Sequence, residues 1–141
     1  MMSILPSNNG KFRNKEIGAW GETIATNYLI KQGFLIIDRN FLKKWGEIDI
    51  VARGTDKKVH FVEVKTVSYE TKHYLNEAVT RRTWRPEENV HPYKLKKFNR
   101  AIESWLSEKK YNGEWQIDVI GVRVVPREKY ATVMLISNVI L

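Results

Sequence analysis

Apolar and polar residues alternate in two runs near the middle of the chain, residues 47–52 and 59–67. Residues 53–58, which are mostly polar and include a glycine, separate the two runs. This pattern predicts two strands joined by a short turn. Because successive side chains of a strand point to opposite faces, Glu63 and Lys65 fall on the same face as the apolar positions 59, 61 and 67. Two charges therefore lie within a run that is otherwise suited to burial.

Residues 14–32 carry apolar side chains at three- and four-residue spacing, which predicts an amphipathic helix. Gly18 and Gly21 weaken such a helix, and their presence predicts close packing of the helix against a sheet. Glu22 falls at the edge of the apolar stripe. From this position it either reaches past the sheet toward the central strands or stays a solvated charge, and the pattern leaves both open.

The other segments complete an α/β order of elements. Residues 34–40 are mostly apolar and predict a covered strand, whereas residues 68–90 show poor periodicity and predict a long loop. A second amphipathic helix is expected over residues 92–109, and strands over residues 115–125 and 131–141. The order helix, three strands, loop, helix, two strands predicts a small sheet of about five strands flanked by helices.

Length and composition indicate one globular domain over residues 1–141, with residues 1–13 as a loose tail. The chain has no apolar run near the length that spans a bilayer, so we expect no membrane insertion. It contains no cysteine, which excludes disulfides and thiolate metal sites and is compatible with the cytoplasm.

The chain has a formal net charge of +8, which favours a polyanionic partner, with nucleic acid ahead of a membrane surface. Residues 81–100 hold seven Lys or Arg against two Glu, a net charge of +5. We expect this window to form a positive rim that contacts phosphates. The candidate nucleic-acid-binding residues are Arg81, Arg82, Arg85, Lys94, Lys96 and Lys97. A solvated helix face or a loop held by aromatic packing is the alternative.

Asp49 lies in the middle of the apolar segment Ile48-Asp49-Ile50-Val51. A buried carboxylate is normally paired, bound to a metal or open to a cleft. Asp49 and Glu63 together fit a hard divalent cation, Mg²⁺ or Mn²⁺, with waters and a substrate phosphate completing the shell. Lys65, one pleat beyond Glu63, would orient the attacking water or stabilise charge on phosphorus. Glu47 shares a strand face with Asp49 and would either bind the metal or pair with a nearby lysine. The alternative is a strand hairpin with a Glu–Lys ladder on its surface.

An acid followed about a dozen residues later by Glu-X-Lys resembles the core of the PD-(D/E)XK, or restriction-endonuclease-like, superfamily, although Ile48 replaces the proline. More widely, the chain resembles the YraN-like bacterial family of that superfamily. The matching blocks are Gly18-Ala-Trp-Gly21-Glu22, Gly33-Phe34, Arg39-Asn40, Gly46-Glu47-Ile48-Asp49-Ile50-Val51, Phe61-Val62-Glu63-Val64-Lys65, Glu77-Ala78-Val79 and Ile117-Asp118-Val119. The resemblance implies a nuclease-type site at Glu22, Asp49, Glu63 and Lys65, in which Glu22 supplies a further or water-mediated metal ligand.

Two positions depart from that family. Val67 stands where the family usually has an arginine, and residues 80–89 read as an insertion. The layout is also similar to that of archaeal Holliday-junction resolvases, which by analogy suggests branched or structured DNA. The first interpretation is thus a metal-dependent endonuclease acting on DNA. The second is a non-catalytic nucleic-acid-binding module on the same fold, and the third a basic interaction protein. The oligomeric state, a homodimer included, stays open.

Overall fold

The computed structural model describes residues 14–81 and 92–139, with the side chains of residues 81 and 92–95 left out. The elements in chain order are α1 (Asn14–Lys31), β1 (Leu35–Lys43), β2 (Gly46–Arg53), β3 (Val59–Ser68), α2 (Lys72–Arg81), α3 (Pro92–Glu108), β4 (Trp115–Val125), the 3-10 turn η2 (Pro126–Glu128) and β5 (Tyr130–Ile136). The sequence predicted the ends of α1, β2, β3 and β4 to within one residue.

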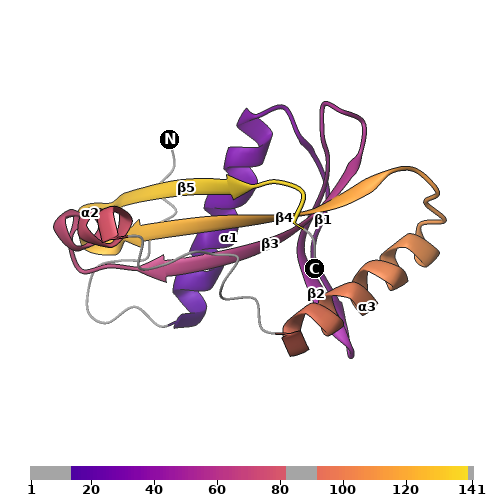
Figure 1. Ribbon diagram of the computed structural model, residues 1–141, viewed down its shortest axis with the longest axis horizontal. Helices are drawn as coiled ribbons and strands as arrows, with labels where there is room; N and C mark the ends of the chain where they lie inside the picture. The colour runs from indigo at the N-terminus through magenta and orange to yellow at the C-terminus, as the bar shows by residue number, and fades with distance from the viewer. Residues whose placement is uncertain (1–13, 82–91, 140–141) are drawn as a thin grey trace.

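The five strands form one mixed sheet in the order β1-β2-β3-β4-β5 (Figure 1). Neighbouring strands are antiparallel except β3 and β4, which are parallel. The connection from β3 to the parallel β4 contains α2 and α3, as a parallel pair requires a long crossover. The predicted α/β class, with a mixed sheet of five strands and flanking helices, is confirmed, and the layout is consistent with a restriction-endonuclease-like fold.

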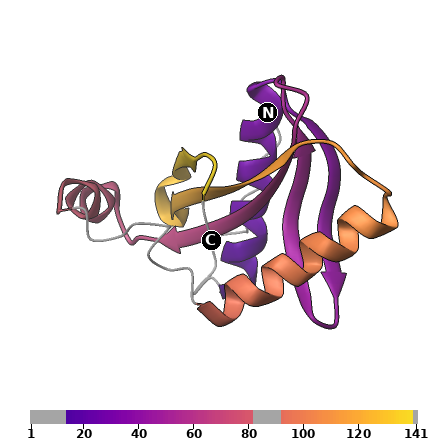
Figure 2. The same cartoon turned by 45° about the vertical axis from the view of Figure 1, so that its right-hand side comes forward.

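Helices cover both faces of the sheet. The apolar stripe of α1 packs one core cluster against β2, β3 and β4 through Ile17, Trp20, Ala25 and Leu29. Phe98, Ala101, Ile102 and Trp105 of α3 pack a second cluster on the other side. Figure 2 shows α3 crossing β1 and β2, whereas α2 lies at the far end of β3 and β4. Within the described ranges, no helix combines the length and the apolar content that a bilayer crossing needs.

The predictions for two segments are wrong. Residues 34–40 were expected to form a covered strand, but β1 is an edge strand on which Leu35 is 66% and Leu42 71% exposed. Residues 68–90 were expected to form a loop, yet residues 72–81 form α2. The apolar periodicity of this helix is weak because, among its described side chains, Leu75 alone is buried. A local signal was present, since the Tyr74 N–H donates to Thr71 Oγ1 at the start of the helix.

The two glycines of α1 have different surroundings. A Cβ at Gly21 would lie 1.8 Å from the Thr66 hydroxyl oxygen, so the helix approaches β3 as closely as only glycine permits. At Gly18, by contrast, no atom of the described residues outside the helix's own backbone lies within 4 Å of such a Cβ, and the predicted close packing there is wrong. The contact at Gly21 sets the height of its neighbour Glu22 above the sheet.

These surroundings predict opposite effects of the same substitution. Gly18→Ala should stabilise the fold by up to about 1 kcal/mol, because alanine favours the helix. Gly21→Ala should instead destabilise it by about 1–2 kcal/mol, since overpacking typically costs about 1–3 kcal/mol. Urea denaturation of both variants measures the difference. Equal shifts of the same sign would contradict the packing at Gly21.

A buried polar network ties the β2–β3 turn to β4. The His60 ring contacts Asp118 Oδ2 through Nδ1 at 2.6 Å and the Asp56 carboxylate through Nε2 at 3.1 Å. Asp118 Oδ1 accepts hydrogen bonds from Gln116 Nε2 and from the Asn138 N–H. Asp118 is fully buried and His60 is 4% exposed. The network therefore provides hydrogen-bond partners for two ionisable side chains in the core.

Candidate active site

The strands β2 and β3 stop pairing at the predicted site. Their register joins residues 50–53 to residues 59–62, and Asp49 and Glu63 are the next residues on each strand. Ile48 packs in the cluster under α3, whereas Ile50 packs in the cluster under α1, so the regular alternation of β2 is broken at Asp49. The Val64 N–H donates to Asp49 Oδ2 at 2.8 Å. The carboxylate thus takes the place of a backbone partner where the strands separate.

Three carboxyl groups meet at this opening. The Asp49 side chain is hydrogen-bonded to the side chains of both Glu63 and Glu22. Burial, followed by the charge of Glu63, raises the pKa of Asp49 to about 8. Glu63 is itself 5% exposed. A hydrogen bond between two carboxyl groups requires a proton, so at neutral pH the group retains one. The structure brings together Asp49, Glu63 and Glu22, the acids selected from the sequence.

Glu22 reaches the opening from α1. Its partial burial raises its pKa, and the charges of Glu47 and Glu63 act in the same direction. The hydrogen bond with Asp49 and the charge of Arg39 act against this rise. Arg39 is a cation of the site that the sequence reasoning missed. A signal was available, because an antiparallel hairpin places residues 39 and 40 beside residues 49 and 50, as the observed pairing of Arg39 with Ile50 does.

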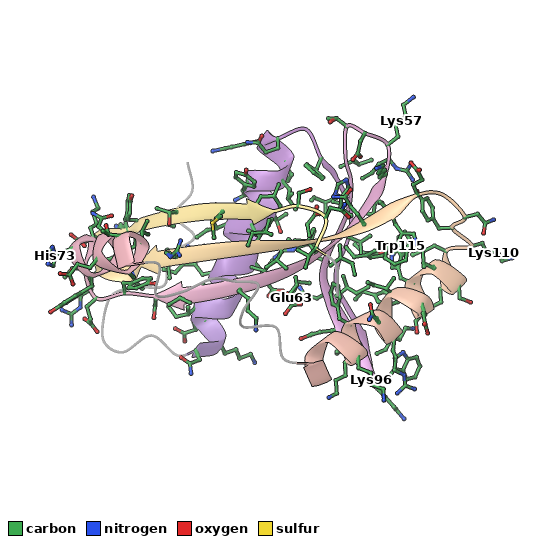
Figure 3. The ribbon with its side chains drawn as sticks, viewed as in Figure 1. Lys57, Glu63, His73, Lys96, Lys110 and Trp115 are labelled. Carbon is green, nitrogen blue, oxygen red and sulfur yellow. The ribbon has the colours of Figure 1, made fainter. Side chains whose placement is uncertain are left out.

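Lys65 lines the same cavity as Asp49. Both residues, together with Glu22 and Val67, line an open cavity of about 500 Å³ between α1 and the end of β3. Figure 3 shows Glu63 near the middle of the molecule, on the strand that carries Lys65. The cavity therefore gives a phosphate-sized group access to a lysine and to two of the three carboxyl groups.

Glu47 takes part in a second cavity. This cavity, of about 370 Å³, is lined by Glu47, Glu63, Lys97 and Gly46 among others. No ion pair joins Glu47 to a described lysine. Its charge is nonetheless close enough to raise the pKa of Glu22. Glu63 thus lines the second cavity together with Glu47, whereas Asp49 and Glu22 line the first.

The donor set suits a hard divalent cation. In the described part of the chain, no three His, Asp or Glu side chains are spaced as a ready coordination shell. Magnesium needs no such shell, because it keeps several waters and is bound through one or two carboxylates plus substrate phosphates. The oxygens of Asp49 and Glu63, oriented by the Val64 N–H, fit this requirement. A cation would then replace the proton that the pair shares.

The predicted phosphate-binding residues are described in part. Lys96 and Lys97 are exposed on α3. Arg81 ends α2 and Lys94 lies in the first turn of α3, with their side chains not described. Arg82 and Arg85 lie outside the described residues. The positive rim over residues 81–100 therefore stays a prediction.

The architecture is thus a mixed α/β sheet that carries three carboxyl groups and a lysine where two strands separate. The chain belongs to UPF0102, described as an uncharacterised protein family, whose model matches residues 21–122. This is the YraN-like family that the sequence resembles. Glu22, Asp49, Glu63 and Lys65 all fall in the matched range.

Individual relatives cover most of the chain. A UPF0102 protein of Campylobacter concisus is 35% identical over 108 residues, which are 75% of this chain and 82% of that protein. One of Syntrophomonas wolfei is 37% identical over 115 residues, 79% of this chain and 87% of the relative. One of Mycobacterium tuberculosis is 35% identical over 121 residues, which are 83% of this chain and 84% of the relative.

The raised pKa of Asp49 predicts a change of stability with pH. Between about pH 4 and pH 8 the folded state holds a proton that the unfolded chain releases, so wild-type stability falls as the pH rises through this window. Asp49→Asn keeps an acceptor for the Val64 N–H and has no proton to lose. The free energy of unfolding of Asp49→Asn should therefore exceed that of wild type by an amount that grows with pH, to the order of a few kcal/mol by pH 8.

Urea denaturation at pH 5 and pH 8, in EDTA, measures this advantage. Asp56→Asn is the control, because Asp56 is exposed and its hydrogen bonds to Lys58 and His60 lower its pKa despite partial burial. That variant should gain no stability at either pH. An Asp49→Asn advantage equal at the two pH values would contradict the buried, protonated carboxyl group.

Proposed function

We propose that this protein is a cytoplasmic, divalent-metal-dependent endonuclease that hydrolyses phosphodiester bonds in DNA, with branched or structured DNA as its substrate. The cofactor would be Mg²⁺ or Mn²⁺. The observation that carries the proposal is the hydrogen-bonded pair Asp49–Glu63 at the opening between β2 and β3, with Glu22 and Lys65 beside it. Branched DNA enters through the likeness in layout to junction resolvases, which is an analogy.

Each residue then has a defined task. Asp49 and Glu63 would hold the cation, and the Val64 N–H keeps Asp49 in position. Glu22 would contribute a further ligand, directly or through water. A bound Mg²⁺ or Mn²⁺ supplies Lewis acidity toward the phosphate and lowers the pKa of a bound water.

Lys65 would act on the reacting phosphate itself. Its ammonium group can orient the attacking water and stabilise the charge that develops on the phosphate oxygens. Such a group contributes most when it is already positioned, and the cavity places Lys65 beside Asp49 and Glu22. The Lys65 side chain also offsets the negative charge that three carboxyl groups present to DNA.

The buried acids favour an enzyme over a binding module. A protein that only binds nucleic acid gains nothing from carboxyl groups near phosphates, because they repel the backbone and are expensive to bury. Here the burial of Asp49 is large enough to raise its pKa to about 8. Strongly shifted pKa values are concentrated in active sites, because catalytic groups need pKa values that suit the reaction.

A cleavage assay beside a gel-shift assay tests the function. Wild type and Glu63→Gln are incubated with duplex, single-stranded and four-way-junction DNA in Mg²⁺ or Mn²⁺. We expect wild type to cut at least one substrate, and Glu63→Gln to bind DNA without cutting it. Wild type that binds DNA and cuts none of these substrates would identify a binding module instead. Wild type that neither cuts nor binds would leave a basic protein with another partner.

A further inference from the structure

The turn between β1 and β2 and the outer face of α3 enclose a basic cavity beside the carboxylate site. Its volume is about 390 Å³, and its lining residues are Lys44, Trp45, Lys96, Lys97 and Arg100. All five are exposed. Four cations and one aromatic ring therefore line the cavity, with no acidic residue among them. These five residues are called the hairpin–α3 patch below.

Trp45 is held in place although it is 38% exposed. Its Nε1–H donates to Ser104 Oγ at 2.9 Å, and Ser104 in turn donates to the Arg100 carbonyl at 3.1 Å. The polar edge of the indole is thus anchored to α3. An apolar ring that is fixed and left open to solvent is a ready surface for stacking, because little side-chain freedom remains to be lost on binding.

The patch opens onto the carboxylate site. Lys44 and Lys97 line both the basic cavity and the neighbouring cavity that contains Glu63. The hairpin is pressed against the helix at this point, since a Cβ at Gly46 would lie 2.1 Å from the Lys97 carbonyl oxygen. Turn and helix therefore form one continuous surface that leads from Trp45 to Glu63. Figure 3 shows Lys96 projecting from the lower edge of α3.

Charge is arranged unevenly around Trp45. No ion pair joins Lys44, Lys96 or Arg100 to another described residue. On the other side of Trp45, a neighbouring cavity is lined by Glu103 and Glu108 as well as Arg100, and Glu108 pairs with Lys43 at 2.7 Å. An anionic chain would therefore find more cations between the carboxylate site and Trp45 than beyond the indole.

We propose that the hairpin–α3 patch binds an unpaired strand of the DNA substrate, with its phosphates on Lys44, Lys96, Lys97 and Arg100 and one base stacked on Trp45. Stacking on a side chain requires a base that is not enclosed in a duplex. The preferred substrate would then carry a single-stranded arm next to the cleaved bond. This inference rests on the proposed nuclease function for the direction of the strand, but binding itself needs no cleavage.

The test compares two DNA ligands by fluorescence anisotropy in EDTA, which prevents cleavage. One is a blunt duplex and the other is the same duplex with a single-stranded arm. Trp45→Ala should weaken binding of the armed duplex by about tenfold or more and leave the blunt duplex nearly unchanged. Trp45→Phe should restore part of the loss, because a ring remains. Lys44→Gln with Lys96→Gln should flatten the log–log salt dependence by about 0.7 for each lost contact.

Lys57→Gln with Lys110→Gln is the matched control, since it removes the same charge from the opposite end of α3 and from the β2–β3 turn (Figure 3). Equal losses for both ligands, no loss in Trp45→Ala, or an equal effect of the control pair would each overturn the proposal. Circular dichroism confirms that the variants fold. If wild type does not cut DNA but Trp45→Ala selectively loses the armed duplex, the patch stands and the nuclease function fails. The reverse result rejects the patch alone.

Discussion

Replacing Lys65 with alanine should slow DNA cleavage by about 10²–10³-fold, the usual effect of removing one group that stabilises charge in a transition state. Asp49 and Glu63, which would hold the cation, remain in place. The variant should therefore still bind Mn²⁺ and DNA. Single-turnover cleavage in saturating metal measures the chemical step, and a titration with Mn²⁺ measures the metal.

Two further variants serve as a control and as a comparison for this result. Lys31→Ala removes an exposed lysine at the end of α1 and should cut at the wild-type rate. Glu63→Gln should lose cleavage together with metal binding, and its affinity for DNA should be kept or increased because one carboxylate that repels phosphate is gone. If Lys65→Ala cuts as fast as wild type, Lys65 has no part in the reaction.

Replacing Asp118 with alanine should lower the free energy of unfolding by about 3–5 kcal/mol, which is typical of removing one partner from a buried charged pair. The substitution leaves His60, Gln116 and the Asn138 N–H without their common acceptor. Burial opposes ionisation of both groups, yet their hydrogen bonds keep the pKa of His60 raised and that of Asp118 lowered. Urea denaturation at pH 6 measures the loss.

The matched control is Asp56→Ala, which removes the other partner of His60. The Asp56 side chain is 43% exposed, so this variant should lose less than about 1 kcal/mol. The pH dependence has a definite sign. The contribution of His60 is complete below its ordinary pKa of 6.5 and is lost as the pH rises through the raised value. That of Asp118 is present above its ordinary pKa of 3.8 and is lost as the pH falls through the lowered value. Equal losses in Asp118→Ala and Asp56→Ala would contradict the network.

Local pattern predicted the parts of the fold whose signals are local. The bounds of β2, β3 and β4 follow from apolar alternation, and the turn of residues 53–58 brings Asp49 opposite Glu63 by simple antiparallel counting. Hence the central pair of the site could be chosen from the sequence. The edge position of β1 could not be predicted from local pattern, because the exposure of Leu35 depends on the order of the strands in the sheet.

Contacts between distant segments explain the other misses. Arg39, which was missed, acts on Glu22 from β1. Glu22 was selected from the sequence, but its position at the site depends on the close approach of Gly21 to Thr66. His60 and Asp118 are 58 residues apart and meet because β3 and β4 pair in parallel, with His60 aligned to residue 116. Neither alternation nor spacing encodes such a register. The same holds for Trp45, whose partner Ser104 lies on α3.

Anomalous diffraction from a crystal soaked in Mn²⁺ tests most directly whether the carboxyl groups at the opening between β2 and β3 form a metal centre. We predict one strong peak about 2.0–2.6 Å from oxygens of both Asp49 and Glu63, within the range of Mg²⁺ and Ca²⁺ distances to oxygen. Glu22 should lie next to it, directly or through water, and Glu63→Gln crystals should lose it. A peak bound elsewhere, or no peak between Asp49 and Glu63 at saturating Mn²⁺, would contradict the metal-dependent site.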